Sequence, residues 1–266
     1  MKDRNVRLTI IWAFIISWTG ITPSLLKSYN IYYPPVLDGL VILQYFGALI
    51  AALIFVYKDG GASGIKRLFS KFTKVKAAIW VILAVILLPW ILSLLSTFIG
   101  FQLSDSVWPE KWTAQEVLGR FAAAIVLQLL LNTEEFVWRG VVFDSWLKKY
   151  GYLKACVVLA GVWWAFHMPM FLRNGGHEAG QELLPFSIMV ISMTFVMGWL
   201  YKHTLGSLLY VHLFHQLLNS VSESLPLFPQ LNGGIKAPYS VFIALTASLG
   251  LIAVLYEFKR RKVPMQ

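Results

Sequence analysis

The sequence is poor in several features that would mark common classes of enzyme. It has a single cysteine, Cys156, which excludes an internal disulfide. No HExxH pattern occurs, so the two-histidine site of the zincin metalloproteases is excluded, and no P-loop spacing occurs either. Only one aspartate, Asp38, falls within a long apolar segment, whereas an aspartyl protease of the membrane would need two. Charged residues make up only 14% of the chain, too few for an ordinary soluble surface.

Long apolar runs are abundant instead. Hydrophobic residues make up 58% of the 266 residues, and a soluble protein this apolar would expose large sticky patches. Runs of about 20 apolar residues, the length that crosses a bilayer core, recur along the chain. We therefore predict an all-α, polytopic membrane protein with about eight transmembrane helices. Their expected cores are Leu8–Leu26, Val36–Tyr57, Ala77–Gly100, Val117–Asn132 with a polar extension, Leu153–Phe171, Leu184–Tyr201, Leu205–Val221 and Tyr239–Phe258.

The net charge of +10 is explained by membrane orientation rather than by nucleic-acid binding. If the N-terminus is cytoplasmic and eight spans alternate, most of the lysines and arginines fall on the cytoplasmic side, which is the positive-inside bias. We therefore expect an integral, multi-pass protein with both termini in the cytoplasm and no nucleic-acid partner, whose basic residues are attracted to anionic lipid of the bilayer. The short chain without extra domains favours a bacterial cell membrane.

The chain is expected to form one integral-membrane domain, residues 1–266. Residues 1–112 supply three spans and a basic loop, residues 113–222 a catalytic core in helices four to seven, and residues 223–266 the last span and a basic tail. Within the basic loop, Ile65, Leu68, Phe69, Phe72 and Val75 recur at helical spacing. This spacing predicts an amphipathic stretch on the membrane surface.

Three clusters of polar residues interrupt the apolar core segments. They are Glu134, Glu135 and Arg139; then Trp163-Trp-Ala-Phe-His167; then His212, His215 and Asn219. Each ionisable group near the bilayer centre costs about 2.5–3.5 kcal/mol on insertion scales, so such residues usually serve a function. Glu135 and Arg139 are one helical turn apart and can pair, which leaves Glu134 facing elsewhere.

Depth in the membrane links the first two clusters. Helices four and five should form an antiparallel hairpin that turns near Tyr150. Glu134 precedes that turn by about as many residues as His167 follows it, so at about 1.5 Å per residue the two lie at the same depth. His215 is less well aligned but still lies within the membrane. A glutamate and two histidines at one level make a plausible reaction site, although each alone is more often structural.

The three patterns together resemble the CAAX prenyl protease type II family, also called the CPBP or Abi family of glutamate-type intramembrane endopeptidases. That family has EExxxR, FxxxH and HxxxN/D on successive helices. Here they read Glu134-Glu135-Phe-Val-Trp-Arg139, Trp163-Trp-Ala-Phe-His167 and His215-Gln-Leu-Leu-Asn219. The resemblance covers roughly residues 115–222, and the first three spans contribute only topology. Trp163 stands where the family has phenylalanine, and its packing role is expected to survive.

The resemblance implies roles for these residues. Glu134 and His167 would activate a water molecule, His215 and Asn219 would hold the oxyanion, and Glu135 and Arg139 would fix the helix. Trp163 and His212 would support the site structurally. Glutamate and histidine are also legitimate zinc ligands. We nevertheless predict no metal and no other cofactor, because a hydrogen-bonded water explains the residue set and an asparagine is better suited to donating a hydrogen bond.

The predicted activity is hydrolysis of a peptide bond in a membrane-associated or lipidated peptide or protein. A lipidated C-terminus, a signal-peptide-like or pheromone precursor and a bacteriocin-type peptide all remain possible substrates. Two other functions stay open on the sequence. One is a non-catalytic membrane scaffold or immunity-type protein with the same fold, and the other is a proton-coupled transporter that uses Glu134 and the histidines as a relay.

Overall fold

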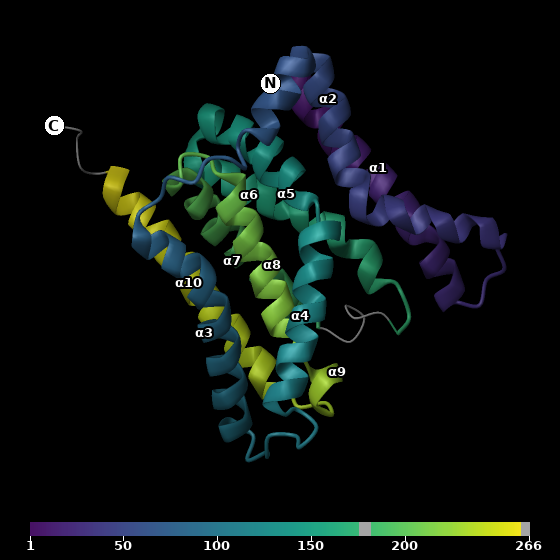
Figure 1. Cartoon of the computed structure of the whole chain (residues 1–266), viewed down its shortest axis with the longest axis vertical. Coiled ribbons are helices and arrows are strands. Elements are labelled where there is room, and N and C mark those ends of the chain that lie inside the picture. Colours follow the sequence, from purple (N-terminus) through teal and green to yellow (C-terminus); the bar gives the residue numbers. More distant parts are fainter. Residues whose placement is uncertain (176–181, 262–266) are drawn as a thin grey trace.

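The computed structural model of the chain describes residues 1–175 and 182–261, and all regular secondary structure in these ranges is helical. The predicted all-α class is therefore confirmed (Figure 1). In chain order the elements are α1 (Asp3–Ser28), η1 (Pro35–Leu40), α2 (Val41–Phe69), α3 (Ile79–Leu103), α4 (Ala114–Leu131), α5 (Glu134–Val137), the π-helical η2 (Trp138–Phe143), α6 (Asp144–Phe171), α7 (Leu183–His203), α8 (Leu208–Glu223), α9 (Pro229–Asn232) and α10 (Ala237–Arg261).

Seven helical segments of the described chain are long and apolar enough to cross a membrane, one fewer than the sequence predicted. They are Asp3–Ser28, Pro35–Phe69, Ile79–Leu103, Ala114–Leu131, Glu134–Phe171, Leu183–His203 and Ala237–Arg260. The predicted span Leu205–Val221 forms α8, which has only 16 residues. At about 1.5 Å per residue it is about 24 Å long, short of a hydrocarbon core of about 30 Å. Most of α8 is buried against neighbouring helices, so it meets protein rather than lipid.

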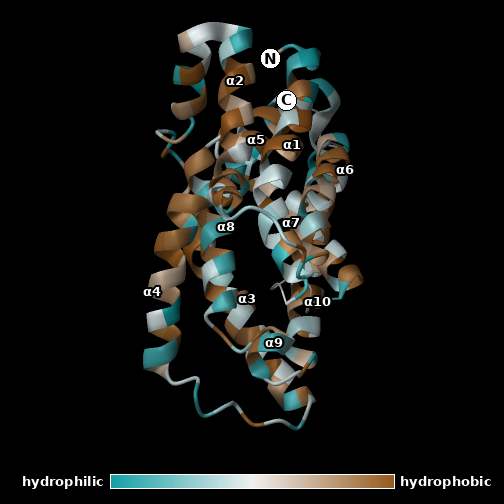
Figure 2. Cartoon of the chain, turned by 90° about the vertical axis from the view of Figure 1, so that its right-hand side faces the viewer, coloured by the Kyte–Doolittle hydropathy of each residue, from teal (hydrophilic) through white to brown (hydrophobic). Residues whose placement is uncertain are grey.

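The N-terminus and the end of α10 lie at the same end of the molecule (Figures 1 and 2). At this end Lys149 pairs with Asp3, and Lys202 and His203 pair with Glu257. Figure 2 shows hydrophilic residues gathered at the two ends of the bundle, with hydrophobic helices between them. This arrangement is that of a membrane-spanning protein. Seven crossings alone would leave the termini at opposite ends, so their position at one end requires α8 also to run between the two ends of the bundle, enclosed by other helices. The identity of that end as the cytoplasmic side stays a prediction.

A sharp reversal at Gly151 divides α6 into two antiparallel parts. Gly151 has φ 75° and ψ 172°, a conformation that a residue with a Cβ adopts only with strain. The side chains of Glu134 and Trp163, 29 residues apart, are in contact. An unbroken helix would separate them by about 43 Å. The predicted hairpin with its turn near Tyr150 is therefore present, and it folds back within the segment Glu134–Phe171.

A second reversal, at Gly61, folds the end of α2 back on itself. Gly61 has φ 57° and ψ −153°, and a Cβ at Gly64 would lie 2.8 Å from the carbonyl oxygen of Val56. Part of the segment that follows packs on the protein, whereas Phe69 and Val75 stay 45% and 58% exposed, so the expected position on the membrane surface stays a prediction. Leu68 is buried, and the ring of Phe72 lies 4.8 Å from that of Phe136.

Lys71, in the same folded-back segment, fastens it to the start of α6. Its Nζ donates to the carbonyl oxygen of Gly140 at 2.6 Å and lies 3.3 Å from the Asp144 carboxylate. Burial lowers the pKa of Lys71 below its usual value, and the charge of Asp144 opposes that shift. Leu68 and Phe72 of this segment therefore contact η2 and α5.

Small residues allow the central helices to approach closely. A Cβ at Gly198 of α7 would lie 2.8 Å from Sγ of Cys156 on α6, and one at Gly20 of α1 would lie 2.2 Å from the backbone of Gln44 on α2. Such contacts are typical of helix pairs in membranes, where dispersion forces rather than hydrophobic burial hold helices together. Cys156 is consequently sealed between α6 and α7.

Gly151→Ala should destabilise the protein by about 1–3 kcal/mol because the hairpin needs a backbone conformation that alanine strains. Thermal unfolding in detergent, followed by the fluorescence of the eleven tryptophans, measures the effect. Gly161→Ala is the matched control on the same helix, since nothing lies within 4 Å of a Cβ there. Equal melting temperatures for the two variants would contradict the assigned turn.

Candidate active site

Glu134 stands at the start of a new helix rather than on an extension of the fourth span. Helix α4 ends at Leu131, and Asn132 has extended backbone angles. The hydroxyl of Thr133 donates to the carbonyl oxygen of Tyr45 on α2 at 2.7 Å, and Asn132 Oδ1 accepts from the backbone N–H of Glu134 at 3.4 Å. Short polar side chains compete in this way with helical hydrogen bonds, and the break they cause sets the position of Glu134.

Glu135 and Arg139 form the ion pair that their spacing predicted. Arg139 Nη1 donates to Glu135 Oε1 at 2.8 Å, and both side chains are fully buried. The arginine lies in η2, a stretch of π-helix in which every residue is buried. Single π-turns within α-helices are rare and often occur at functional sites.

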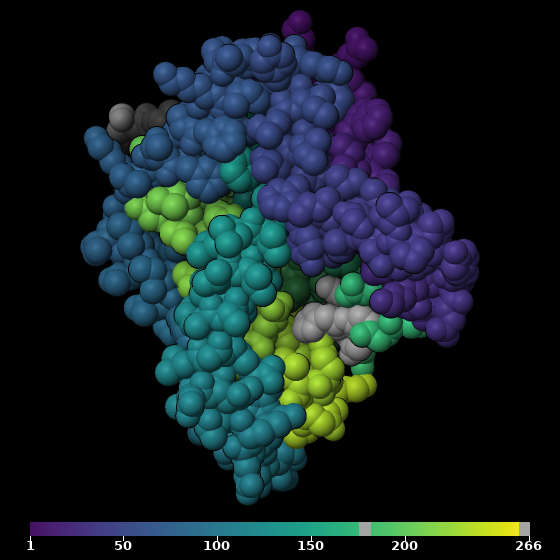
Figure 3. Space-filling model, turned by 45° about the vertical axis from the view of Figure 1, so that its right-hand side comes forward, coloured from purple at the N-terminus to yellow at the C-terminus, as the bar shows by residue number. Residues whose placement is uncertain are grey.

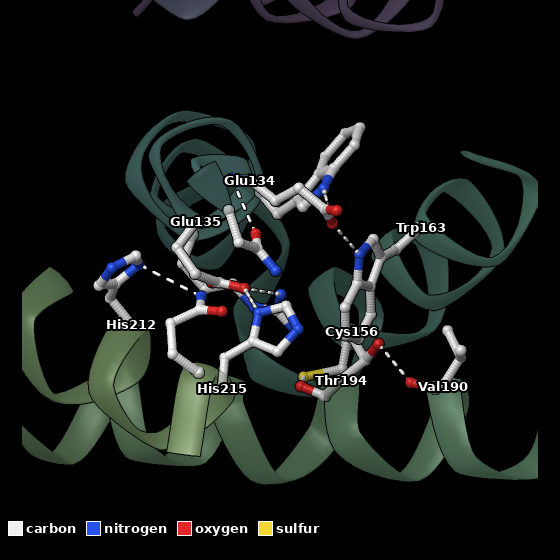
Figure 4. Close-up of polar contacts among 12 residues, drawn as sticks. Glu134, Glu135, Cys156, Trp163, Val190, Thr194, His212 and His215 are labelled. Carbon is white, nitrogen blue, oxygen red and sulfur yellow. Dashed lines mark hydrogen bonds and ion pairs between the residues drawn. The ribbon is translucent and has the colours of Figure 1, made fainter. Parts of the chain in front are cut away.

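The carboxylate of Glu134 is held by two tryptophans (Figure 4). The indole N–H groups of Trp163 and Trp138 both donate to Oε2, at 2.8 Å and 3.1 Å. Trp138 lies one turn farther along the same helical segment, and Trp163 reaches across the hairpin from α6. Because both indoles bond to Oε2, Oε1 is left for another partner.

Hydrogen bonds fix the proton positions of both site histidines. His167 Nδ1 lies 2.7 Å from the carbonyl oxygen of Trp163, which can only accept, so Nδ1 carries the hydrogen and Nε2 is the free acceptor. His215 Nδ1 lies 2.9 Å from Glu135 Oε1, and the carboxylate likewise accepts from it. Each imidazole therefore keeps Nε2 for chemistry beyond its anchoring bond.

Glu134, His167, His215 and Asn219 line one cavity of about 400 Å³. They come from α5, α6 and α8, and Asn219 lies one turn beyond His215. Residues from α4 and the start of α2 complete the wall, and Figure 3 shows a hollow on the surface between α4 and the start of α2. The sequence predicted that Glu134 and His167 lie at the same depth, with His215 less well aligned, and all three line this cavity.

His212 lies apart from this cavity. It is 8% exposed, its Nδ1 is 3.4 Å from Gln216 Nε2, and its ring packs against Phe72. His212 lies on the same face of α8 as His215. It is one turn nearer the end of the helix that the folded-back α2 segment covers. Its position is that of a supporting residue.

Sequence reasoning missed several residues that shape the cavity. Trp138 could have been found, because it stands four residues after Glu134 and so on the same helical face. Gln44 and Tyr45 of α2 also line the cavity, although they lie in the spans outside the segment that carries the family resemblance. The wall also contains four methionines whose sequence positions carried no signal: Met170, Met189, Met193 and Met197.

The described residues provide no group of three histidine, cysteine, aspartate or glutamate side chains arranged to hold a metal ion. Glu134 is already engaged by two indoles, and His215 is bonded to Glu135 rather than paired with His167 on a shared centre. The arrangement can accept protons from a small molecule in the cavity and can donate hydrogen bonds to it.

The fold and the cavity define a multi-pass helical membrane protein with a glutamate and two histidines lining one cavity. Residues 114–221 match the family described as Type II CAAX prenyl endopeptidase Rce1-like. The chain is also 29% identical over 112 residues to the CAAX prenyl protease 2 of Methanococcus maripaludis, a match that spans 40% of this chain and 41% of that protein. The family resemblance read from the sequence is therefore confirmed over α4 to α8, the segment that holds all four cavity-lining polar residues named above.

Arg139→Gln should destabilise the protein by about 3–5 kcal/mol, because it leaves the Glu135 carboxylate buried without its countercharge. Arg120→Gln is the matched control: Arg120 pairs with Glu116 at 2.6 Å on the exposed face of α4, and such pairs contribute about 0–1 kcal/mol. Unfolding in detergent measures both variants. The double variant Glu135→Gln with Arg139→Gln should recover part of the loss, and failure to do so would contradict a charge-based cause.

Proposed function

We propose that the chain is an intramembrane endopeptidase that hydrolyses a peptide bond of a membrane-associated or lipidated substrate by direct attack of water. The observation that carries the proposal is the meeting of Glu134, His167, His215 and Asn219 around one cavity within the bundle. The similarity of residues 114–221 to the type II CAAX prenyl endopeptidases supports the same reaction class.

In this reaction Glu134 and His167 act on the attacking water. Oε1 of Glu134 accepts a proton from water, and Nε2 of His167 accepts a hydrogen bond from the same water and orients it. The water oxygen then attacks the carbonyl carbon, and the carbonyl electron pair moves onto the oxygen. Glu134 returns its proton to the amide nitrogen as the carbon–nitrogen bond breaks, which releases a carboxylic acid and an amine.

The oxyanion would be held from α8. The side-chain amide of Asn219 donates to it, and His215 Nε2 donates when the imidazole carries a second proton. The carboxylate of Glu135, bonded to His215 Nδ1 at 2.9 Å, fixes the orientation of the ring and leaves Nε2 toward the cavity. Preorganised donors of this kind are each worth about 2.7–4 kcal/mol in kcat.

The walls of the cavity favour a substrate with a bulky apolar group. Phenylalanine and leucine side chains and the four methionines surround the polar residues. Methionine is flexible and polarisable, so a methionine-rich wall adapts to apolar groups of different shape. A peptide with a prenylated C-terminal cysteine motif, the substrate class in the name of the relative, has this chemistry.

Glu134→Gln should abolish cleavage, with kcat lowered by at least about 10²–10⁴-fold, because the amide cannot accept the proton of water. The assay uses purified protein in liposomes and an internally quenched peptide, tested with and without a prenylated CAAX end. Glu116→Gln, on the exposed face of α4, is the control and should cleave normally.

A protein that acts as a scaffold or a transporter gives different results in the same assay. A scaffold would bind the peptide without cleaving it, and a transporter would carry protons across the liposome membrane without a cleaved product. Either result with the unsubstituted protein would overturn the proposal.

Cleavage should survive incubation with a strong chelator, with a change of less than about twofold, because the proposed water activation needs only the proton acceptors of the cavity. Elemental analysis of the purified protein, before and after chelation, accompanies the assay. Loss of activity that zinc restores would contradict the water mechanism proposed for this chain and favour the zinc alternative.

A further inference from the structure

We propose that Trp163 is a positioning residue for Glu134, through a hydrogen bond that phenylalanine at this site could not make. The inference rests on the proposed hydrolysis for its effect on rate. It goes beyond the packing role that the family resemblance assigns to an aromatic residue at this position.

Two indole groups fix the carboxylate of Glu134 from different directions. The Trp163 N–H donates to Oε2 at 2.8 Å from across the hairpin, and the Trp138 N–H donates to the same oxygen at 3.1 Å from the next turn of the chain. An indole N–H can only donate, so both bonds require an acceptor at Oε2. The rotation of the carboxylate is thereby set, with Oε1 as the oxygen that remains for the water (Figure 4).

The ring of Trp163 also contacts the other charged and polar groups of the site. The guanidinium carbon of Arg139 lies 4.5 Å from its centre, a cation–π contact. The rings of His215 and His167 approach edge to face, with centres 5.5 Å and 5.4 Å away. Trp163 is 4% exposed, so these contacts are made away from bulk solvent.

This arrangement has two consequences for the proposed reaction. The two indole donors occupy Oε2, which leaves Oε1 as the oxygen that accepts the proton of the water. The shared ring also holds Glu134 in register with both histidines. A phenylalanine would keep the ring contacts and lose the donor, which makes Trp163→Phe a selective test.

Trp163→Phe should lower kcat for peptide cleavage by about 10- to 100-fold, the effect of losing one hydrogen bond to a charged group, while KM changes by less than about twofold. The loss should fall on kcat and not on KM, because the ring that lines the site is kept and only the donor to Glu134 is removed. A general disturbance of the substrate cavity would change KM as well.

Trp164→Phe is the matched control. Trp164 is the next residue on α6, and its indole N–H donates to Ser187 Oγ at 2.8 Å, away from the residues that line the cavity. This variant loses an indole hydrogen bond of the same length and should keep the kcat and KM of the unsubstituted protein. Normal kcat in Trp163→Phe would overturn the proposal.

An NMR measurement tests the hydrogen bond without any activity. In protein labelled with ¹⁵N-tryptophan, Glu134→Gln should shift the indole N–H resonances of Trp163 and Trp138 and leave that of Trp164 in place. If the unsubstituted protein cleaves no peptide, the proposed function fails, and these shifts still decide the positioning role. Unchanged resonances for Trp163 would overturn that role.

Discussion

The contact on which the site depends most is the one that a single oxygen of Glu135 makes with two partners. Oε1 accepts from Arg139 at 2.8 Å and from His215 at 2.9 Å, so it joins the α5–η2 segment to α8. Arg139 stacks on Trp163, and Trp163 bonds to Glu134. The two adjacent glutamates thus differ in function: Glu135 is a fixed, fully buried countercharge, and Glu134 faces the cavity with one oxygen unengaged by the indoles.

Irregular backbone puts these groups in place, and each irregularity is stabilised by contacts within the protein. Non-helical backbone at membrane depth is tolerated only where protein satisfies its polar groups. At the break after α4, Thr133 donates to the carbonyl oxygen of Tyr45 on α2. At the end of α2, the reversed segment delivers Lys71 to the Gly140 carbonyl of η2. Helices outside the matched segment 114–221 therefore help to hold the reaction site in shape.

The sequence sufficed for those features that depend on composition and on regular helical geometry. Apolar runs predicted the all-α membrane fold, and counting residues from the turn near Tyr150 predicted that Glu134 and His167 meet. The four-residue spacing of Glu135 and Arg139 predicted their pair. These inferences hold because the period and rise of a helix are nearly constant.

Other features depended on tertiary contacts that one sequence does not reveal. The end of α4 is decided by Asn132 and Thr133 and their partner on α2. Leu68 and Phe72 of the basic loop contact the protein because Gly61 reverses the chain. Seven helical segments are long enough to be candidate spans against about eight predicted, because α8 has only 16 residues. To predict the indole hydrogen bonds to Glu134, one would need to know the direction of the Trp163 side chain and the position of the hairpin turn.

The buried thiol of Cys156 can report the separation of α6 from α7. It is the single thiol of the chain, it is fully buried, and Gly198 of α7 lies directly against its sulfur. A thiol in such a place reacts with a label only after α6 and α7 separate. The rate of labelling in the intact protein therefore records how often these two helices come apart, without any engineered probe.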